Sequence, residues 1–178
     1  MRSFQSTYKN IVEHVGAFTA DLSSLFLRLI AAKVFLDSGL TKWNGWFQFN
    51  ASKYDLFKYE YFCPDPPREG ALQLCDPQTL DYVDGSTIES VVNGLALSAG
   101  IMEVLFPVLL IAGLFTRFAA LALIGMTLFI QLLIFPTWSH WINPASWWAV
   151  VLFAVFAFGP GRLSLDRLFG LDKGNKSA

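Results

Sequence analysis

The sequence predicts an all-α integral membrane protein, built as an antiparallel bundle of four transmembrane helices with a large extracytoplasmic loop. Of its 178 residues, 54% are hydrophobic and only 15% are charged, which is too little charge to cover a water-soluble domain of this size. Four apolar runs are also near the roughly 20 helical residues that a hydrocarbon core of about 30 Å requires. In one domain, residues 1–178, we expect spans at about residues 18–40, 91–115, 118–135 and 145–159, with the outer loop at 41–90.

The connections between the runs indicate how the spans are arranged. Only Gly113-Leu114-Phe115-Thr116-Arg117 separates the second run from the third, and so short a link favours antiparallel neighbours. The fourth run is short, but apolar and aromatic residues precede it, and Gly159-Pro160-Gly161 ends it, because neither Gly nor Pro continues a helix well. Small residues in the second and third runs would let these helices approach closely.

The basic residues predict the orientation in the membrane. An even number of spans places both termini on one side, and that side carries most of the Lys and Arg outside the long loop, which places it in the cytoplasm. We therefore expect a multi-pass protein of the bacterial inner membrane whose first span is retained. The residues on that side are Arg2, Lys9, Arg117, Arg162, Arg167, Lys173 and Lys176.

Two segments outside the spans have the pattern of short surface helices. In residues 1–17, apolar residues recur at helical spacing, which favours either a short helix lying on the membrane or a disordered tail. After the last span, residues 162–169 predict an interfacial helix, with Ser164 as its N-cap and Asp166 near its positive end.

Ionisable residues at membrane depth are the sharpest functional signal, because each is costly there unless it is paired or hydrated. Four qualify: Arg28, Lys33, Asp37 and Glu103. Lys33 and Asp37 are four residues apart and share a helix face, whereas Arg28 points elsewhere. We expect Glu103 to pair with Arg28 or with Lys33. Two interpretations remain open: a polar pocket that anchors a quinone head group or passes protons, and a buried ion pair that sets helix register.

The cysteines and histidines limit the available chemistry. Cys63 and Cys75 lie in the outer loop, where an oxidising compartment favours a disulfide, either as a structural staple or as a redox-active pair. His14 and His140 lie on opposite sides of the membrane, which excludes a bis-His haem. His140 is either a proton-handling group or single metal ligand, or a residue of the aromatic belt. No metal site and, at net charge −1, no nucleic-acid partner is expected.

Three stretches resemble the DoxX family of small four-helix inner-membrane proteins. Residues 27–29 and 35–42 are similar to the family's first span, with its early Arg and its Gly-x-x-Lys exit. Glu103 and residues 113–121 are similar to its Glu-containing span and Gly-Leu-x-Thr-Arg turn. The sequence Gly159-Pro160-Gly161-Arg162-Leu163-Ser164-Leu165-Asp166 resembles a frequent family ending.

The outer loop carries one further resemblance. Leu56-Phe57-Lys58-Tyr59-Glu60-Tyr61 looks like the outer loop of a family subgroup whose members are encoded beside genes for small secreted metal-binding peptides and their maturation enzymes. The cysteine-bearing segment between Pro64 and Glu89 departs from the shorter loop of that subgroup. The density of aromatic residues in the loop favours packing against the membrane or against a protein partner.

The residues and the resemblance together favour three functions of different classes. The first is a membrane subunit of a redox-related complex that meets quinone, with Arg28 and Glu103 as the residues carried over. The second is a non-catalytic scaffold or maturation partner that presents the outer loop to a secreted metal- or thiol-handling protein. The third is a small transporter that uses Lys33, Asp37 and Glu103. The partners implied are the lipid bilayer and a redox or maturation protein, and quinone is the one cofactor implied.

Overall fold

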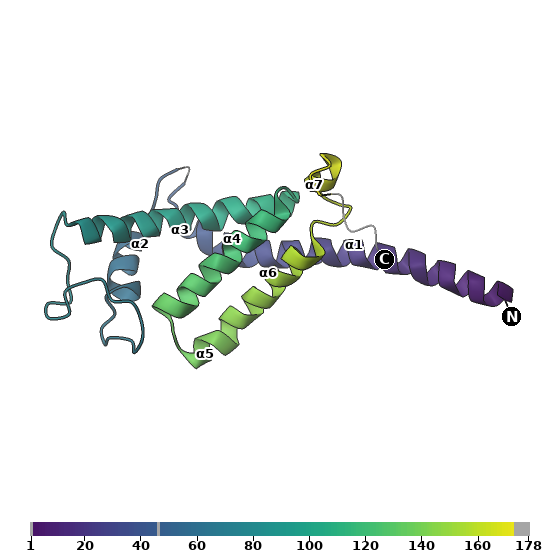
Figure 1. Cartoon of the computed structure of the whole chain (residues 1–178). Helices are drawn as coiled ribbons and strands as arrows, with labels where there is room; N and C mark the ends of the chain where they lie inside the picture. The colour runs from purple at the N-terminus through teal and green to yellow at the C-terminus, as the bar shows by residue number, and fades with distance from the viewer. Residues whose placement is uncertain (1, 46, 173–178) are drawn as a thin grey trace.

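The fold was analysed in a computed structural model that describes residues 2–45 and 47–172, with the backbone alone for residues 2–14, 17 and 18. The regular structure of the described chain is helical, apart from two isolated β-bridges at Trp43–Phe49 and Asp76–Asp81, and irregular chain joins the helices (Figure 1). In order, the elements are α1 (Arg2–Leu40), α2 (Ala51–Asp55), the π-helical turn η1 (Leu56–Tyr61), α3 (Thr87–Ala112), α4 (Thr116–Phe129), the π-helical turn η2 (Ile130–Ile134), α5 (Trp138–His140), η3 (Trp141–Ala145), α6 (Ser146–Phe158) and α7 (Leu165–Leu168).

Three helical segments of the described chain are long and apolar enough to cross a membrane. They are Thr87–Ala112, Thr116–Ile134 and Trp138–Phe158, and they correspond to the second, third and fourth predicted spans. These segments confirm a helical membrane protein. The segment at 18–40 lies within α1 and carries four charged residues, so its role as a further span stays a prediction.

Helix α1 differs from the prediction at its N-terminal end. A separate surface helix or a disordered tail over residues 1–17 was expected, whereas α1 runs without a break from Arg2 to Leu40. No proline interrupts this stretch, and at 1.5 Å per residue its 39 residues span about 58 Å. The N-terminal end of α1 therefore projects beyond the other helices (Figure 1). Residue 1 and the basic residues Lys173 and Lys176 lie outside the described residues.

The helices enclose two apolar clusters. The larger joins α1, α3, α4 and α6, and consists of Ala31, Ala32, Phe35, Leu110, Ala119, Ala120, Leu123, Met126, Leu152 and Val155. Its alanines allow the helices to approach closely. The smaller joins α3 and η2 to the segment between α1 and α3, and consists of Phe57, Phe62, Val92, Ala96 and Ile134. We call the end of the bundle that this second cluster covers the loop end, and the opposite end the α7 end.

Two glycines set the register between α1 and α3. A Cβ at Gly39 would lie 2.6 Å from the carbonyl oxygen of Glu103, and a Cβ at Gly113 would lie 2.0 Å from Nη1 of Arg28. Gly113 also ends α3 in the left-handed conformation, with φ of 67°, which glycine adopts without steric cost. The two contacts are ten residues apart along α3, so they are separated by about 15 Å of helix.

Candidate functional site

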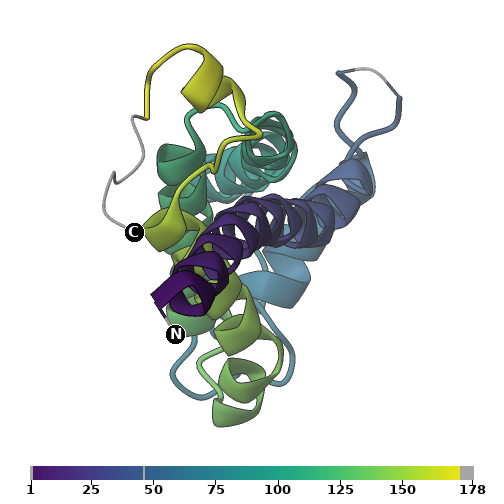
Figure 2. The same cartoon turned by 90° about the vertical axis from the view of Figure 1, so that its right-hand side faces the viewer.

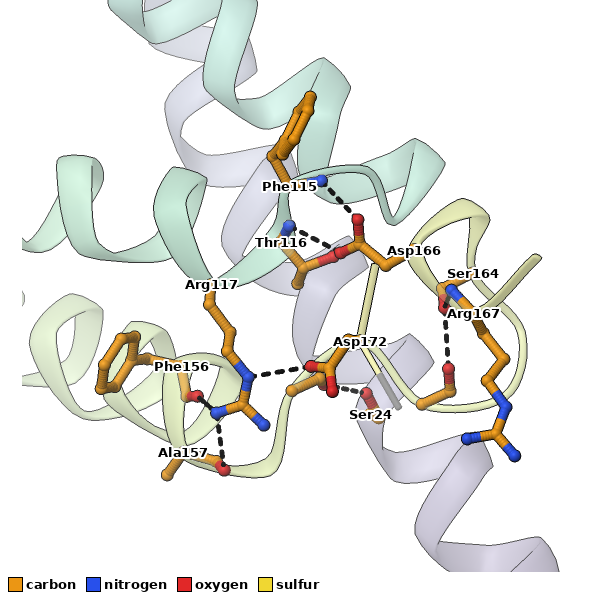
Figure 3. Close-up of polar contacts among 12 residues, drawn as sticks. Ser24, Phe115, Thr116, Arg117, Phe156, Ala157, Ser164, Asp166, Arg167 and Asp172 are labelled. Carbon is orange, nitrogen blue, oxygen red and sulfur yellow. Dashed lines mark hydrogen bonds and ion pairs between the residues drawn. The ribbon is translucent and has the colours of Figure 1, made fainter. Parts of the chain in front are cut away.

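The α7 end holds a cluster of charged side chains bonded to backbone groups (Figure 3). Arg28 is buried, with 1% of its surface exposed. Its Nη2 donates to the carbonyl oxygen of Leu163 at 2.5 Å and its Nη1 to that of Leu110 at 3.4 Å. The Asp166 carboxylate accepts from the backbone N–H groups of Phe115 at 2.7 Å and Thr116 at 2.9 Å. Asp166 therefore satisfies the first N–H groups of α4, which lack partners within the helix.

Arg117 extends this cluster to the end of α6. Its Nη1 donates to the carbonyl oxygens of Phe156 at 2.5 Å and Ala157 at 3.3 Å, and its Nε donates to Asp172 at 2.9 Å. Ser164 caps α7 as predicted, because its hydroxyl accepts from the N–H of Arg167. We call Arg28, Arg117, Ser164 and Asp166 the α7-end clasp. The clasp joins the three stretches on which the family resemblance rests, so their polar residues hold the bundle together here.

The other predicted pocket residues on α1 lie on its outer side. Lys33 pairs with Asp37 at 2.5 Å, as their spacing predicts, and the two side chains are 74% and 61% exposed. Neither lines the cavity described below. Arg28, Lys33 and Asp37 therefore do not form one site.

The prediction that Glu103 pairs with Arg28 or Lys33 is wrong. Glu103 Oε2 instead lies 2.5 Å from Nζ of Lys42, and both side chains are only 7% exposed. Nζ also donates to Ser38 at 3.2 Å. Lys42 was assigned to the outer loop because the apolar run ends at Leu40. The residue that could have indicated this pair is Gly39. Its close contact with Glu103 brings Lys42, three residues further along the chain, to the same depth as Glu103.

A cavity of about 520 Å³ lies beside this ion pair. Its walls are mostly apolar side chains from α1, α3, α4 and the segments at the loop end, and Ser38, Lys42 and Glu103 form a polar part of the wall. A largely apolar cavity with a few converging polar groups is the usual form of a small-molecule site. We take this loop-end cavity as the candidate functional site.

Five rings in near-continuous contact line another part of the cavity, and they include His140. The ring of His140 stacks on Phe135 with centroids 4.9 Å apart, and it meets Trp148 edge-on at 6.5 Å. Tyr61 extends the row beyond Phe135 at 5.7 Å, and Phe35 extends it beyond Trp148 at 5.8 Å. We call these five residues the aromatic wall. His140 thus lies in an aromatic setting, where its Nδ1 is 2.6 Å from the side-chain oxygen of Gln131.

Tyr61 brings a phenol hydroxyl to this wall. Burial, with a smaller contribution from the charge of Glu103, raises the pKa of the Tyr61 phenol above its ordinary value. The phenol therefore keeps its proton at neutral pH. Tyr61 was not predicted as a site residue; the aromatic density of residues 54–62 was the available signal.

The segment between α1 and α3 is stapled and packed onto the bundle. Cys63 and Cys75 form the predicted disulfide, with their Cα atoms 5.6 Å apart. The two cysteines are only 3% and 8% exposed, so the folded protein offers little of either residue to a partner thiol. An ion pair between Lys58 and Glu89 also ties η1 to the start of α3. These contacts favour the structural interpretation of the disulfide over the redox-active one.

The charged loop residues shift one another's titration. The phenol of Tyr59 donates to Asp81 at 3.0 Å. The N–H of Tyr82 and this phenol lower the pKa of the Asp81 carboxyl. Burial raises the pKa of Tyr82 itself to about 12. In the part of the chain that the structure describes, no group of three or more His, Cys, Asp or Glu side chains lies close enough to hold a metal ion.

The comparison with protein families supports the resemblance seen in the sequence. The DoxX family model matches residues 77–136, which include the end of the loop, α3, α4 and η2. Over these residues the chain is similar to the DoxX family, and its apolar helices are those of a membrane protein. Comparison with curated proteins and with solved structures gives no significant match. The match contains Glu103 and the turn at residues 113–117, two of the features that carry the resemblance seen in the sequence. Arg28, Lys42, Ser164 and Asp166 lie outside the matched residues.

Proposed function

We propose that this protein is the membrane subunit of a redox complex, and that its loop-end cavity binds the head group of a quinone. The observation that carries the proposal is the buried Lys42–Glu103 pair in the wall of a largely apolar cavity of about 520 Å³. The proposal places the segment 18–40 in the membrane as a fourth span, both termini in the cytoplasm of a bacterial inner membrane, and the loop outside.

The shape and chemistry of a quinone match this cavity. A quinone head group is a flat apolar ring with two carbonyl oxygens that accept hydrogen bonds. Lys42 and Tyr61 supply donors, and the aromatic wall supplies ring faces for stacking. The apolar side chains that line the rest of the cavity suit the isoprenoid tail, which enters from the lipid.

The Lys42–Glu103 pair would distinguish the oxidation states of the ligand. Reduction of a quinone adds two electrons and two protons, one proton to each oxygen. Lys42 is a donor that favours the carbonyl form, whereas the Glu103 carboxylate is an acceptor for a quinol hydroxyl. In this proposal a redox partner protein that binds near the loop end supplies the two electrons.

Co-purified quinone tests this proposal. The protein is purified in mild detergent, extracted with organic solvent, and its quinones are measured by mass spectrometry against an unrelated membrane protein. We expect near-stoichiometric quinone in the natural protein and at least a tenfold loss in Glu103→Gln and Lys42→Gln. Lys33→Gln is the matched control, because it removes the same charge from the same helix region at a site outside the cavity. Equal retention in all variants, or no enrichment in the natural protein, would refute quinone binding.

The scaffold alternative retains one supporting observation, the stapled loop. Residues 76–86 extend from the disulfide to the start of α3 and include Val83, which is 77% exposed. A partner that binds there would be lost when residues 77–85 are replaced by a short Gly-Ser linker, while quinone binding persists. The transporter alternative loses its geometric basis, because Lys33 and Asp37 lie outside the cavity that Glu103 lines.

A further inference from the structure

The outer side of α1 carries a regular stripe of exposed residues. Helix α1 packs against α3 and α6, and within the described chain its opposite side has no helix beside it (Figure 2). Residues that are each more than half exposed recur there at intervals of four, three, four and three. We call them the α1 stripe: Phe26, Ile30, Lys33, Asp37 and Leu40.

The charged part of the α1 stripe lies at membrane depth. Gly39 abuts Glu103 and Gly113 abuts Arg28, so Lys33 and Asp37 run alongside residues 103–113 of α3. That helix is one of the three apolar enough to cross a membrane. An isolated chain would therefore expose an ion pair to lipid, whereas ionisable residues in membranes almost always face protein or water.

The spacing of the stripe indicates that another helix covers it. Residues that recur at an average interval of 3.5 form the contact line of two helices that pack in a left-handed coiled coil. Towards the N-terminus the same spacing continues through Ser23, Thr19 and Gly16, all exposed. Small residues at such positions let the backbones of two membrane helices approach closely.

The charges of the stripe are self-complementary. The pair contains one cation and one anion, a single helical turn apart, so its net charge is zero. Two copies inserted in the same orientation bring their α1 helices together in parallel about a two-fold axis. In that arrangement Lys33 of each copy can reach Asp37 of the other, which closes a ring of four alternating charges.

We propose that the α1 stripe is the seam of a homodimer in which two copies pair through parallel α1 helices, joined by the Lys33–Asp37 ring. The seam lies on the opposite side of α1 from the loop-end cavity, so it does not depend on quinone binding. The dimer places the two cavities on the outside of the assembly, open to lipid and to partner proteins.

Single-cysteine cross-linking in native membranes tests the seam. The two natural cysteines are joined to each other, so Ile30→Cys provides a lone free thiol on the stripe. Leu121→Cys is the matched control, since Leu121 is a 54% exposed residue of α4. We expect a short bis-maleimide to produce at least tenfold more covalent dimer from Ile30→Cys than from Leu121→Cys. Equal yields, no dimer at Ile30, or cross-linking of Ile30→Cys to a protein of another mass would each overturn the proposal.

Charge exchange tests the ring itself. In the Ile30→Cys background, Asp37→Lys places four cations in the seam, and we expect the dimer yield to fall at least tenfold. The exchange K33D/D37K restores the alternation, and we expect the yield to return to within about twofold of the parent. The elution profile in detergent and the intact Cys63–Cys75 disulfide verify folding of each variant. A yield that the single reversal leaves unchanged, or that the exchange fails to restore, contradicts the ring.

Discussion

The two ends of the bundle hold their buried charges in different ways. At the α7 end, Arg28, Arg117 and Asp166 bond mainly to backbone carbonyl and N–H groups of distant segments. At the loop end, Lys42 and Glu103 bond to side chains, and they do so in the wall of a cavity. A charged side chain that is hydrogen-bonded to backbone groups stabilises the contact between the segments that carry them. A charge bonded to a side chain at a cavity remains available to a ligand that enters.

This difference separates two residues that the sequence alone treats as equivalent. Arg28 and Glu103 are both ionisable, both buried and both part of the family resemblance. Arg28 of α1 lies against Gly113, which is about 15 Å along α3 from Glu103. Arg28 also has two backbone acceptors. Arg28 is therefore a structural residue of the clasp, and Glu103 is the residue expected to matter for ligand binding.

Removal of the Asp166 carboxylate is expected to have the largest effect on stability. Asp166→Ala leaves the buried N–H of Thr116 and the partly buried N–H of Phe115 without acceptors, and each bond to a charged group contributes roughly 1.5–3 kcal/mol. We expect the free energy of unfolding in mixed micelles to fall by about 3–5 kcal/mol. Asp172→Ala is the control, since Asp172 pairs with an Arg117 side chain that is 43% exposed, and it should cost about 1 kcal/mol or less. Equal losses in the two variants would contradict the clasp.

The ion pair at the loop end should behave as an exchangeable unit. Lys42→Met or Glu103→Leu alone leaves an uncompensated buried charge, and we expect each to lower the free energy of unfolding by about 3 kcal/mol. The double variant removes both charges and should recover most of that loss, because an apolar pair of similar volume replaces a buried ion pair at little cost. A double-mutant cycle in micelles measures the coupling. Purely additive losses would show that the two side chains do not act as a pair.

The double variant also separates stability from function. We expect it to fold yet to lose co-purified quinone, because the apolar pair supplies neither a donor nor an acceptor. No analogous rescue is expected at the α7 end, where backbone groups are the partners of Arg28 and Asp166 and cannot be substituted. A double variant that keeps its quinone would assign binding to the aromatic wall alone.

The smallest predicted effect is a pH dependence of the loop. The pKa of Tyr82 is raised to about 12 in the folded protein, against an ordinary value near 10. The folded state therefore holds the phenol proton more tightly than the unfolded chain, so stability is lost as pH rises from about 10 towards 12. Tyrosinate absorbance measured as a function of pH should show a phenol of the natural protein that titrates above pH 11. This phenol should be missing from the titration curve of Tyr82→Phe. Identical titration curves would contradict the burial of Tyr82.

Local pattern was sufficient for the elements that depend on neighbours in sequence. Hydropathy predicted the spans that match α3, α4 and α6, and i,i+4 spacing predicted the Lys33–Asp37 pair. The cap at Ser164 and the disulfide between Cys63 and Cys75 were also confirmed. The spans, the ion pair and the cap each depend on residues that are close in sequence. The disulfide prediction depended on the oxidising compartment and on the presence of two cysteines in the chain. The continuous α1 was not predicted. Hydropathy does not indicate whether a helix ends or continues where it leaves the bundle.

By itself, the sequence determined that the chain is a helical membrane protein, where its apolar helices lie, and which ionisable residues are too costly to be exposed in lipid. Only the tertiary structure decided which of these charges meet. Lys42 and Glu103 are 61 residues apart, and Asp166 lies 50 residues from the N–H group it caps. Such contacts depend on helix register, which the close approach at Gly39 and Gly113 sets and which hydropathy does not encode.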